Sequence, residues 1–287
     1  MEQETASLVP SAATAPRVLP QRCPWSLRVR LCIGYAFYHL SKGVFLIAAI
    51  PLLLLLFPFP RTRQRVLGGI THAYLGWLSR SGLPAIGIYH LAEVSGLDRA
   101  GAARPAVYVS NHRSRMDGPF LLGLLPNTGV VIKAREGHQW SFALLMRHFD
   151  FVSVSAGNLA RLRGALDRAR EILSEGRSLV IFPEGTRAPS GRLQSFHPLA
   201  FQLARDAGVP IVPVVVHSTL PFMGRIAGSY FPVAPNVFRV RFLEIDRPGP
   251  NEDPDEWSDR IRRRMARELR ELDAGTYWET APRQRHE

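Results

Sequence analysis

The feature that most constrains the fold of this chain is an apolar run of 18 residues, GVFLIAAIPLLLLLFPFP, at residues 43–60. The run contains no charged side chain. As an α-helix it would extend over roughly 27 Å, close to the ~30 Å hydrocarbon core of a bilayer. Pro51, Pro58 and Pro60 are expected to kink or end such a helix. The segment therefore predicts membrane contact or burial in a large core.

Basic residues flank the apolar run on both sides, namely Arg28, Arg30, Arg61, Arg63 and Arg65. Because both ends are basic, the charge pattern gives no clear orientation across a bilayer. A hairpin that enters one leaflet and returns suits this pattern, with residues 67–83 as its second arm. A single membrane span and a buried core helix are the alternatives.

Four parts follow along the chain. Residues 1–24 are rich in Pro, Ala, Ser and Thr and predict a disordered tail, and residues 25–83 form the helical segment with membrane contact. In residues 84–250, short β-rich runs alternate with helical stretches, which indicates an α/β domain with a mixed, largely buried sheet flanked by helices. Residues 251–287 predict a basic amphipathic helix and a tail.

The C-terminal helix has apolar residues at every fourth position: Trp257, Ile261, Met265 and Leu269. Arginines occupy much of the remaining surface. This pattern favours a helix docked on the domain with its charges in solvent, and a helix lying on a membrane is the alternative.

The chain carries 36 Lys and Arg against 24 Asp and Glu, a formal net charge of +12. Such a surface suits an anionic partner, such as lipid headgroups, phosphorylated small molecules or nucleic acid. A nucleic-acid binder is disfavoured, because the basic residues are spread along helices and the apolar run has no place in one. Cys23 and Cys32 are the only cysteines, and no zinc spacing is present, so neither a disulfide scaffold nor a metal site is expected.

A candidate acid–base pair follows the β-rich run at 106–110. The stretch NHRSRMDGPF places His112 on a loop and Asp117 at the start of the next helix. If the loop folds back, the carboxylate meets the imidazole and orients it as a general base. A loop histidine beside a helix-capping aspartate, without any chemistry, is the alternative for this motif alone.

A second candidate motif, FPEGTR at residues 182–187, follows another β-rich run. Glu184, Gly185, Thr186 and Arg187 offer a carboxylate, an open backbone, a hydroxyl and a cation, a set that suits a polyol phosphate. An ordinary turn with a solvated arginine is the alternative. Because ligands gather at the carboxyl ends of strands in open α/β sheets, the two motifs are expected to meet there.

Together these motifs resemble the glycerolipid acyltransferase family, which comprises the lysophosphatidic acid acyltransferases and their relatives. The first family signature, a histidine and an aspartate separated by four residues, corresponds to residues 111–117, and the third corresponds in full to residues 182–187. The fourth, a β run interrupted by prolines, corresponds to VPIVPV at residues 209–214. The resemblance covers about residues 100–220.

The resemblance implies an O-acyltransferase of phospholipid biosynthesis at the cytoplasmic face of a membrane, without a cofactor. His112, held by Asp117, would activate a hydroxyl of lysophosphatidic acid. The hydroxyl would then attack the thioester of acyl-CoA or acyl carrier protein, with no acyl-enzyme. The implied acceptor-binding residues are Lys133, Glu184, Gly185, Thr186 and Arg187.

One departure concerns the second signature, which usually ends in an Asp-Arg pair after a β run. Ser155 and Ala156 occupy those positions here, so a phosphate-binding arginine is missing. Arg161 or Arg163, on the next helix, is a candidate replacement. A different lysolipid or a hydroxy-acyl acceptor is therefore an alternative, as are a hydrolase and a non-catalytic membrane protein that binds anionic lipid. The apolar stretch at 139–151 is either an acyl-chain tunnel or plain core.

Overall fold

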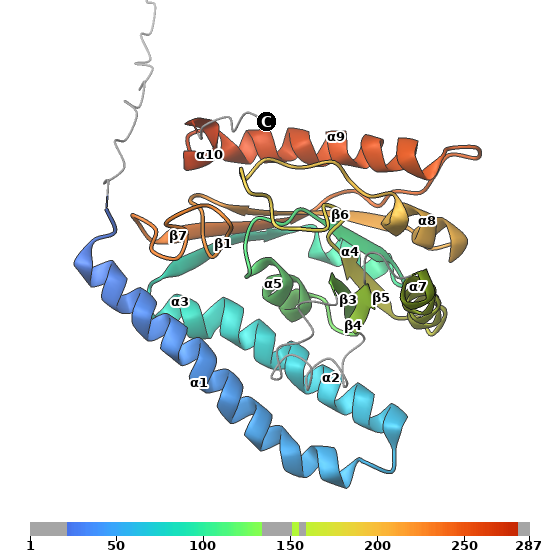
Figure 1. Cartoon of the computed structure of the whole chain (residues 1–287), viewed down its shortest axis with the longest axis horizontal. Helices are drawn as coiled ribbons and strands as arrows, with labels where there is room; N and C mark the ends of the chain where they lie inside the picture. The colour runs from blue at the N-terminus through green and yellow to red at the C-terminus, as the bar shows by residue number, and fades with distance from the viewer. Residues whose placement is uncertain (1–21, 134–150, 155–158, 281–287) are drawn as a thin grey trace, which may run out of the picture.

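A computed structural model describes residues 22–133, 151–154 and 159–280. Within these residues a seven-stranded sheet in the order β1-β7-β6-β2-β5-β3-β4 lies between two layers of helices (Figure 1). The strands are β1 (Tyr89–Ser95), β2 (Val107–Ser110), β3 (Thr128–Lys133), β4 (Phe151–Val154), β5 (Ser178–Ile181), β6 (Ile211–Ser218) and β7 (Asn236–Phe242). Strands β6 and β7 are antiparallel and the other neighbouring pairs are parallel. The predicted mixed sheet is confirmed.

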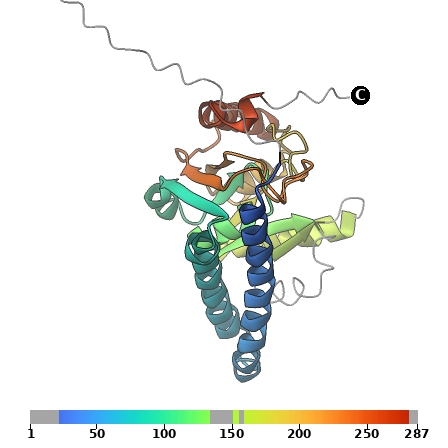
Figure 2. The same ribbon diagram turned by 90° about the vertical axis from the view of Figure 1, so that its left-hand side faces the viewer.

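The helices divide between the two faces of the sheet. They are α1 (Trp25–Leu55), α2 (Pro60–Trp77), α3 (Leu83–Ala85), α4 (Leu97–Ala102), α5 (Asp117–Leu124), α7 (Leu159–Ser174), α8 (Leu199–Asp206), α9 (Pro254–Asp273) and α10 (Tyr277–Thr280). A π-helical turn, Leu78–Gly82, joins α2 to α3. The α1–α2 hairpin extends from one side of the sheet and α9 lies along the other (Figures 1 and 2).

The sheet has a separate hydrophobic core on each face. Strand β2 shows how they arise, because its side chains alternate between faces. Tyr108 packs in the core shared with α1, α3, α4 and α5, whereas Val107 and Val109 pack in the core shared with α7, α8 and α9. All three side chains are fully buried, as expected for a strand covered on both sides.

The C-terminal helix α9 docks on the second core. Trp257, Ile261, Met265 and Leu269 are all buried, and the Trp257 indole N–H donates to Asp246 Oδ1 at 2.7 Å. The four-residue period of apolar side chains therefore faces the sheet, as the sequence predicts for a docked helix.

The first helix begins at Trp25, where the predicted helical segment begins. It differs from the sequence-based expectation in that it continues past Pro51 to Leu55. Pro51 lies inside the helix and does not end it, although a proline there removes one bond to the preceding turn. The second arm begins at Pro60, a favourable first helical residue, rather than at residue 67. The prediction also missed β1 and α4, which have little apolar periodicity.

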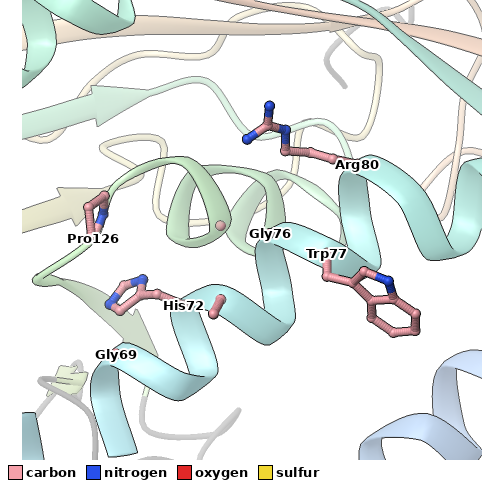
Figure 3. Close-up of a pocket in the computed structure, with 8 residues that line it drawn as sticks. Gly69, His72, Gly76, Trp77, Arg80 and Pro126 are labelled. Atoms are coloured by element: carbon pink, nitrogen blue, oxygen red, sulfur yellow. The ribbon is translucent and has the colours of Figure 1, made fainter. Parts of the chain in front are cut away.

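Helix α2 packs closely against α5 where Gly76 meets Gly123. A Cβ added to Gly76 would lie 2.9 Å from the Gly123 carbonyl oxygen. Beside this contact lies a pocket of about 360 Å³, bordered by Gly69, His72, Ala73, Gly76, Trp77, Arg80, Gly123 and Pro126 (Figure 3). It adjoins the C-terminal end of α5, whereas Asp117 begins that helix, so it is separate from the strand-end motifs.

Candidate active site

The two sequence motifs meet at one edge of the sheet. Strand β2 pairs in parallel with β5 on one side and with β6 on the other, so their carboxyl ends lie together. Asn111 fixes the point where the chain leaves β2. Its side-chain amide donates to the Val216 carbonyl and accepts from the Val216 N–H, both at 2.9 Å.

The predicted contact between His112 and Asp117 is present. Nδ1 of His112 lies 2.9 Å from Oδ2 of Asp117. The same oxygen accepts the backbone N–H groups of Arg113 and Ser114, each at 2.8 Å. Because a carboxylate oxygen only accepts hydrogen bonds, the imidazole proton lies on Nδ1, which leaves Nε2 free to accept a proton.

The two members of this pair differ in how far they are buried. The Asp117 side chain is 1% exposed, whereas the His112 side chain is 22% exposed. The imidazole also stacks on Phe182, with ring centroids 4.3 Å apart and planes at 27°. A ring that is held on one edge and one face, yet still reaches solvent, suits the role of general base, which stays a prediction.

Glu184 of the second motif supports the His112 loop. Its Oε1 accepts the His112 backbone N–H at 2.8 Å, and its Oε2 accepts the Gln194 backbone and side-chain N–H groups at 3.0 and 3.3 Å. Burial raises the pKa of this carboxyl, and the hydrogen bonds from Gln194 and His112 partly offset that rise. These contacts favour a positioning role over acceptor binding, which stays a prediction. Gln194 belongs to no motif, and the sequence did not reveal it.

The rest of the second motif turns back toward His112. Gly185 adopts a left-handed conformation, with φ of 63°, at a turn closed by its N–H to the Phe182 carbonyl. Three residues after Gly185, the Ala188 N–H donates to the His112 carbonyl at 2.7 Å. Thr186 and Arg187 are half-buried between these contacts.

The remaining predicted residues lie around this edge or outside the described part of the chain. Lys133 is the last residue of β3, whose backbone pairs with β4 and β5. Arg161 and Arg163 are exposed on α7. Ser155 and Ala156, and residues 139–150 of the apolar stretch, fall outside the described residues.

A buried ion pair behind the loop was not predicted. The Arg113 guanidinium forms two 2.8 Å hydrogen bonds to the Asp273 carboxylate and lies 4.5 Å from the centre of the Trp278 ring. His217 is fully buried behind the pair, with Nε2 3.4 Å from Asp273 Oδ1, and burial lowers the pKa of this imidazole. Burial acts to raise the pKa of Asp273, but Arg113 and His217 outweigh it, and the net shift is downward. The end of α9 thus holds the residue next to His112.

The sheet and the strand-end site define an α/β protein with an oriented imidazole at the carboxyl ends of β2 and β5. Residues 92–217 match the family model described as Acyltransferase. That part of the chain is therefore similar to acyltransferases, in agreement with the resemblance of its motifs to the glycerolipid acyltransferases.

Named relatives support the same family. The 1-acyl-sn-glycerol-3-phosphate acyltransferase LPAT1, chloroplastic, of Arabidopsis thaliana is 31% identical over 61% of this chain and 47% of its own length. The human 1-acyl-sn-glycerol-3-phosphate acyltransferase beta is 35% identical over 52% of this chain and 53% of its own. The chain thus spans about half the length of these curated relatives.

A solved structure shares the fold. The 1-acyl-sn-glycerophosphate acyltransferase PlsC from Thermotoga maritima superposes with a TM-score of 0.65, covering 86% of this chain and 95% of that one. Its sequence identity is 23%, so the likeness concerns the fold.

Proposed function

We propose that this chain is an O-acyltransferase that transfers a fatty acyl group from a thioester to a hydroxyl of lysophosphatidic acid. The observation that carries the proposal is the 2.9 Å contact between His112 Nδ1 and the buried Asp117 carboxylate, at the edge of the sheet where the FPEGTR loop begins. The names of the relatives support the choice of acceptor.

The proposed reaction needs a single base. His112 Nε2 takes the proton of the acceptor hydroxyl, whose oxygen forms a bond to the thioester carbonyl carbon. The carbon–sulfur bond then breaks, and the imidazolium returns its proton to the departing sulfur, which leaves as a thiol and regenerates the neutral base. Asp117 stabilises the imidazolium while it exists. Acyl-CoA and acyl carrier protein are both suitable donors, since each presents the same thioester.

The hairpin supports a membrane location for this reaction. Among the described helices, α1 alone is long and apolar enough to cross a bilayer. Its exposed apolar side chains recur mostly at intervals of three or four residues along one stripe: Val29, Ile33, Leu40, Val44, Ile47, Ile50 and Leu54. Arg61, Arg63 and Arg65 follow the tip of the hairpin, and their charges favour a hairpin lying in the interface over one inserted tip first. We also propose that the site faces the cytoplasm, because acyl thioester donors are made in the cytoplasm.

The test of the reaction is acyl transfer by the purified full chain in detergent. Labelled acyl-CoA and acyl carrier protein are offered with a panel of lysolipids. Replacing His112 with alanine is expected to lower kcat by about 10²–10⁴-fold. The matched control is His90→Ala, which removes an exposed histidine on β1 and should leave kcat unchanged.

The outcomes separate the alternatives. Transfer to acceptors without a glycerol phosphate would keep the mechanism and replace the substrate. Equal activity of the His112→Ala variant would refute the base, and no transfer to any acceptor would favour a lipid-binding protein without catalysis.

Membrane association has its own test, flotation with anionic vesicles. The double change Ile47→Asp and Leu54→Asp places charges on side chains that are 69% and 66% exposed on α1. It is expected to release the protein from vesicles. The control Leu159→Asp alters a side chain that is 76% exposed on α7 and should have no effect. Equal flotation of all three proteins would contradict the membrane role of α1.

A further inference from the structure

We propose that Arg225, in the loop between β6 and β7, joins Arg187 to form the binding site for the phosphate of the acceptor. The assignment rests on the proposed function, since it names how that acceptor is held. It concerns a residue outside every sequence motif, in a chain where Ser155 and Ala156 stand in place of the Asp-Arg pair that the resemblance leads one to expect.

The turn that carries Arg225 lies directly on the His112 loop. The Met223 carbonyl accepts the Arg115 backbone N–H at 3.2 Å and Arg187 Nη1 at 3.1 Å. A Cβ added to Gly224 would lie 2.8 Å from the Arg113 carbonyl oxygen, so only glycine permits this approach. The residue before Arg225 therefore touches the residue after His112.

This turn is also held internally. Ser229, which is 2% exposed, accepts the Met223 N–H through its carbonyl at 2.9 Å and the Gly224 N–H through its hydroxyl at 3.1 Å. Met223 adopts φ of 47°, a conformation that costs a non-glycine residue free energy and persists only where the surroundings impose it. The position of Arg225 is thus defined by the fold around it.

Arg225 and Arg187 reach across to each other's segments. Arg225 Nη1 donates to the Thr186 hydroxyl at 3.0 Å, one residue before Arg187. Arg187 Nη1 donates to the Met223 carbonyl, two residues before Arg225. Two guanidinium-bearing segments are therefore brought together beside the Gly185 turn.

No carboxylate among the described residues pairs with either arginine. Their recorded partners there are a hydroxyl and a carbonyl, each of which takes one of the five N–H donors of a guanidinium. Two cations on contacting segments, with spare donors and no paired carboxylate among the described residues, suit a dianion of fixed shape. A phosphate monoester is such a ligand, because its oxygens accept paired N–H groups.

The location fits the reaction. The residue that follows Arg187, Ala188, is hydrogen-bonded to the His112 carbonyl at 2.7 Å. In lysophosphatidic acid the free hydroxyl and the phosphate are on neighbouring carbons, so a phosphate held by these arginines brings the hydroxyl to the imidazole. The same loop carries Tyr230 and Phe231, whose rings each lie 6.2 Å from that of Tyr35 on α1. The proposed phosphate site thus borders the hairpin from which a lipid would arrive.

The test combines binding with kinetics on the full chain in detergent. Arg225→Gln removes the charge and keeps a donor for the Thr186 hydroxyl. Equilibrium binding of dispersed lysophosphatidic acid is expected to weaken about tenfold. This is the lower end of the range expected for the loss of a charge-assisted hydrogen bond, because the site is exposed. KM for this acceptor should rise by a similar factor with kcat little changed, and binding of monoacylglycerol, which lacks the phosphate, should be unaffected.

The control is Arg263→Gln, which removes one exposed charge from α9. Unchanged lysophosphatidic acid binding by the Arg225 variant, or an equal loss in the Arg263 variant, would overturn the assignment. Weaker binding confined to the Arg225 variant would support it even if the wild-type protein transferred no acyl group. In that case the phosphate site would stand and the proposed reaction would fail.

Discussion

Replacing Asp273 with asparagine tests whether the end of α9 holds the His112 loop. The exposed fractions of the Arg113 and Asp273 side chains are 5% and 16%, and the carboxylate forms two 2.8 Å bonds to the guanidinium. The amide keeps the size of the side chain and one acceptor, but leaves a buried guanidinium without its counter-charge. The fully buried His217 beside it offers no compensating negative charge.

Removing one partner of a fully buried ion pair costs about 3–5 kcal/mol. Asp273 is partly exposed, so water can reach the charge that remains. We therefore expect a smaller loss in the free energy of unfolding, about 2–3 kcal/mol. For a chain of this size that corresponds to a fall in Tm of about 4–12 °C. Activity should fall as well, because Arg113 follows His112 directly.

Thermal unfolding of the full chain in detergent measures this cost. The double variant Arg113→Met, Asp273→Leu removes both charges and should recover most of the lost stability. The control is Asp259→Asn, which breaks an exposed pair with Arg262 on α9 and should cost less than about 0.5 kcal/mol. If Asp273→Asn is no more destabilising than this control, the pair does not anchor the loop.

Three further predictions follow from the same region. Asp117→Asn should lower kcat by about 10²–10³-fold in steady-state assays with KM little changed, because the amide does not stabilise an imidazolium; equal kcat would contradict this. Gly191→Ala should destabilise by more than about 2 kcal/mol in thermal unfolding, because Gly191 has φ of 72° and a Cβ there would overlap the Trp278 ring. The matched Gly176→Ala change, at φ of 77° with open space around it, should cost only about 1 kcal/mol. Burial lowers the pKa of His217, so the unfolded chain binds a proton below about pH 6.5 that the folded chain does not, and stability should fall from there toward pH 5. His217→Gln should flatten that part of the Tm profile, and an unchanged profile would refute the assignment.

The sequence predicted the parts of the site that depend on local order. His112 and Asp117 are five residues apart across a strand–loop–helix junction, so their meeting requires only that the strand and the helix form where the apolar pattern indicates. The FPEGTR turn was predicted for the same reason, since a glycine after a strand permits the left-handed conformation that a tight turn needs. Both strands were visible as short apolar runs.

The contacts that hold these groups in place could not be predicted in the same way. Arg113 and Asp273 are 160 residues apart, and each belongs to a stretch with several similar charges. Nothing in RSRMD or in RELRELD distinguishes the buried charge from its solvated neighbours. The pair depends on α9 crossing the sheet to end behind β2, which is a property of the whole fold.

Burial divides the motif residues into two groups with different chemistry. Asp117 and Glu184 are 1% and 6% exposed, and they accept hydrogen bonds from the His112 loop, including the His112 imidazole, and from Gln194. A buried carboxylate is tolerated only when the protein satisfies it, so these two hold the loop and its imidazole in place rather than contact substrate. His112 and Arg187 keep part of their surface in solvent. Within the described contacts, the His112 Nε2 atom forms no hydrogen bond, and most of the Arg187 N–H donors are also unused. The residues proposed to touch substrate are therefore those whose hydrogen-bonding groups the fold leaves partly unused. By that criterion Arg225 belongs with His112 and Arg187, whereas Glu184 belongs with Asp117.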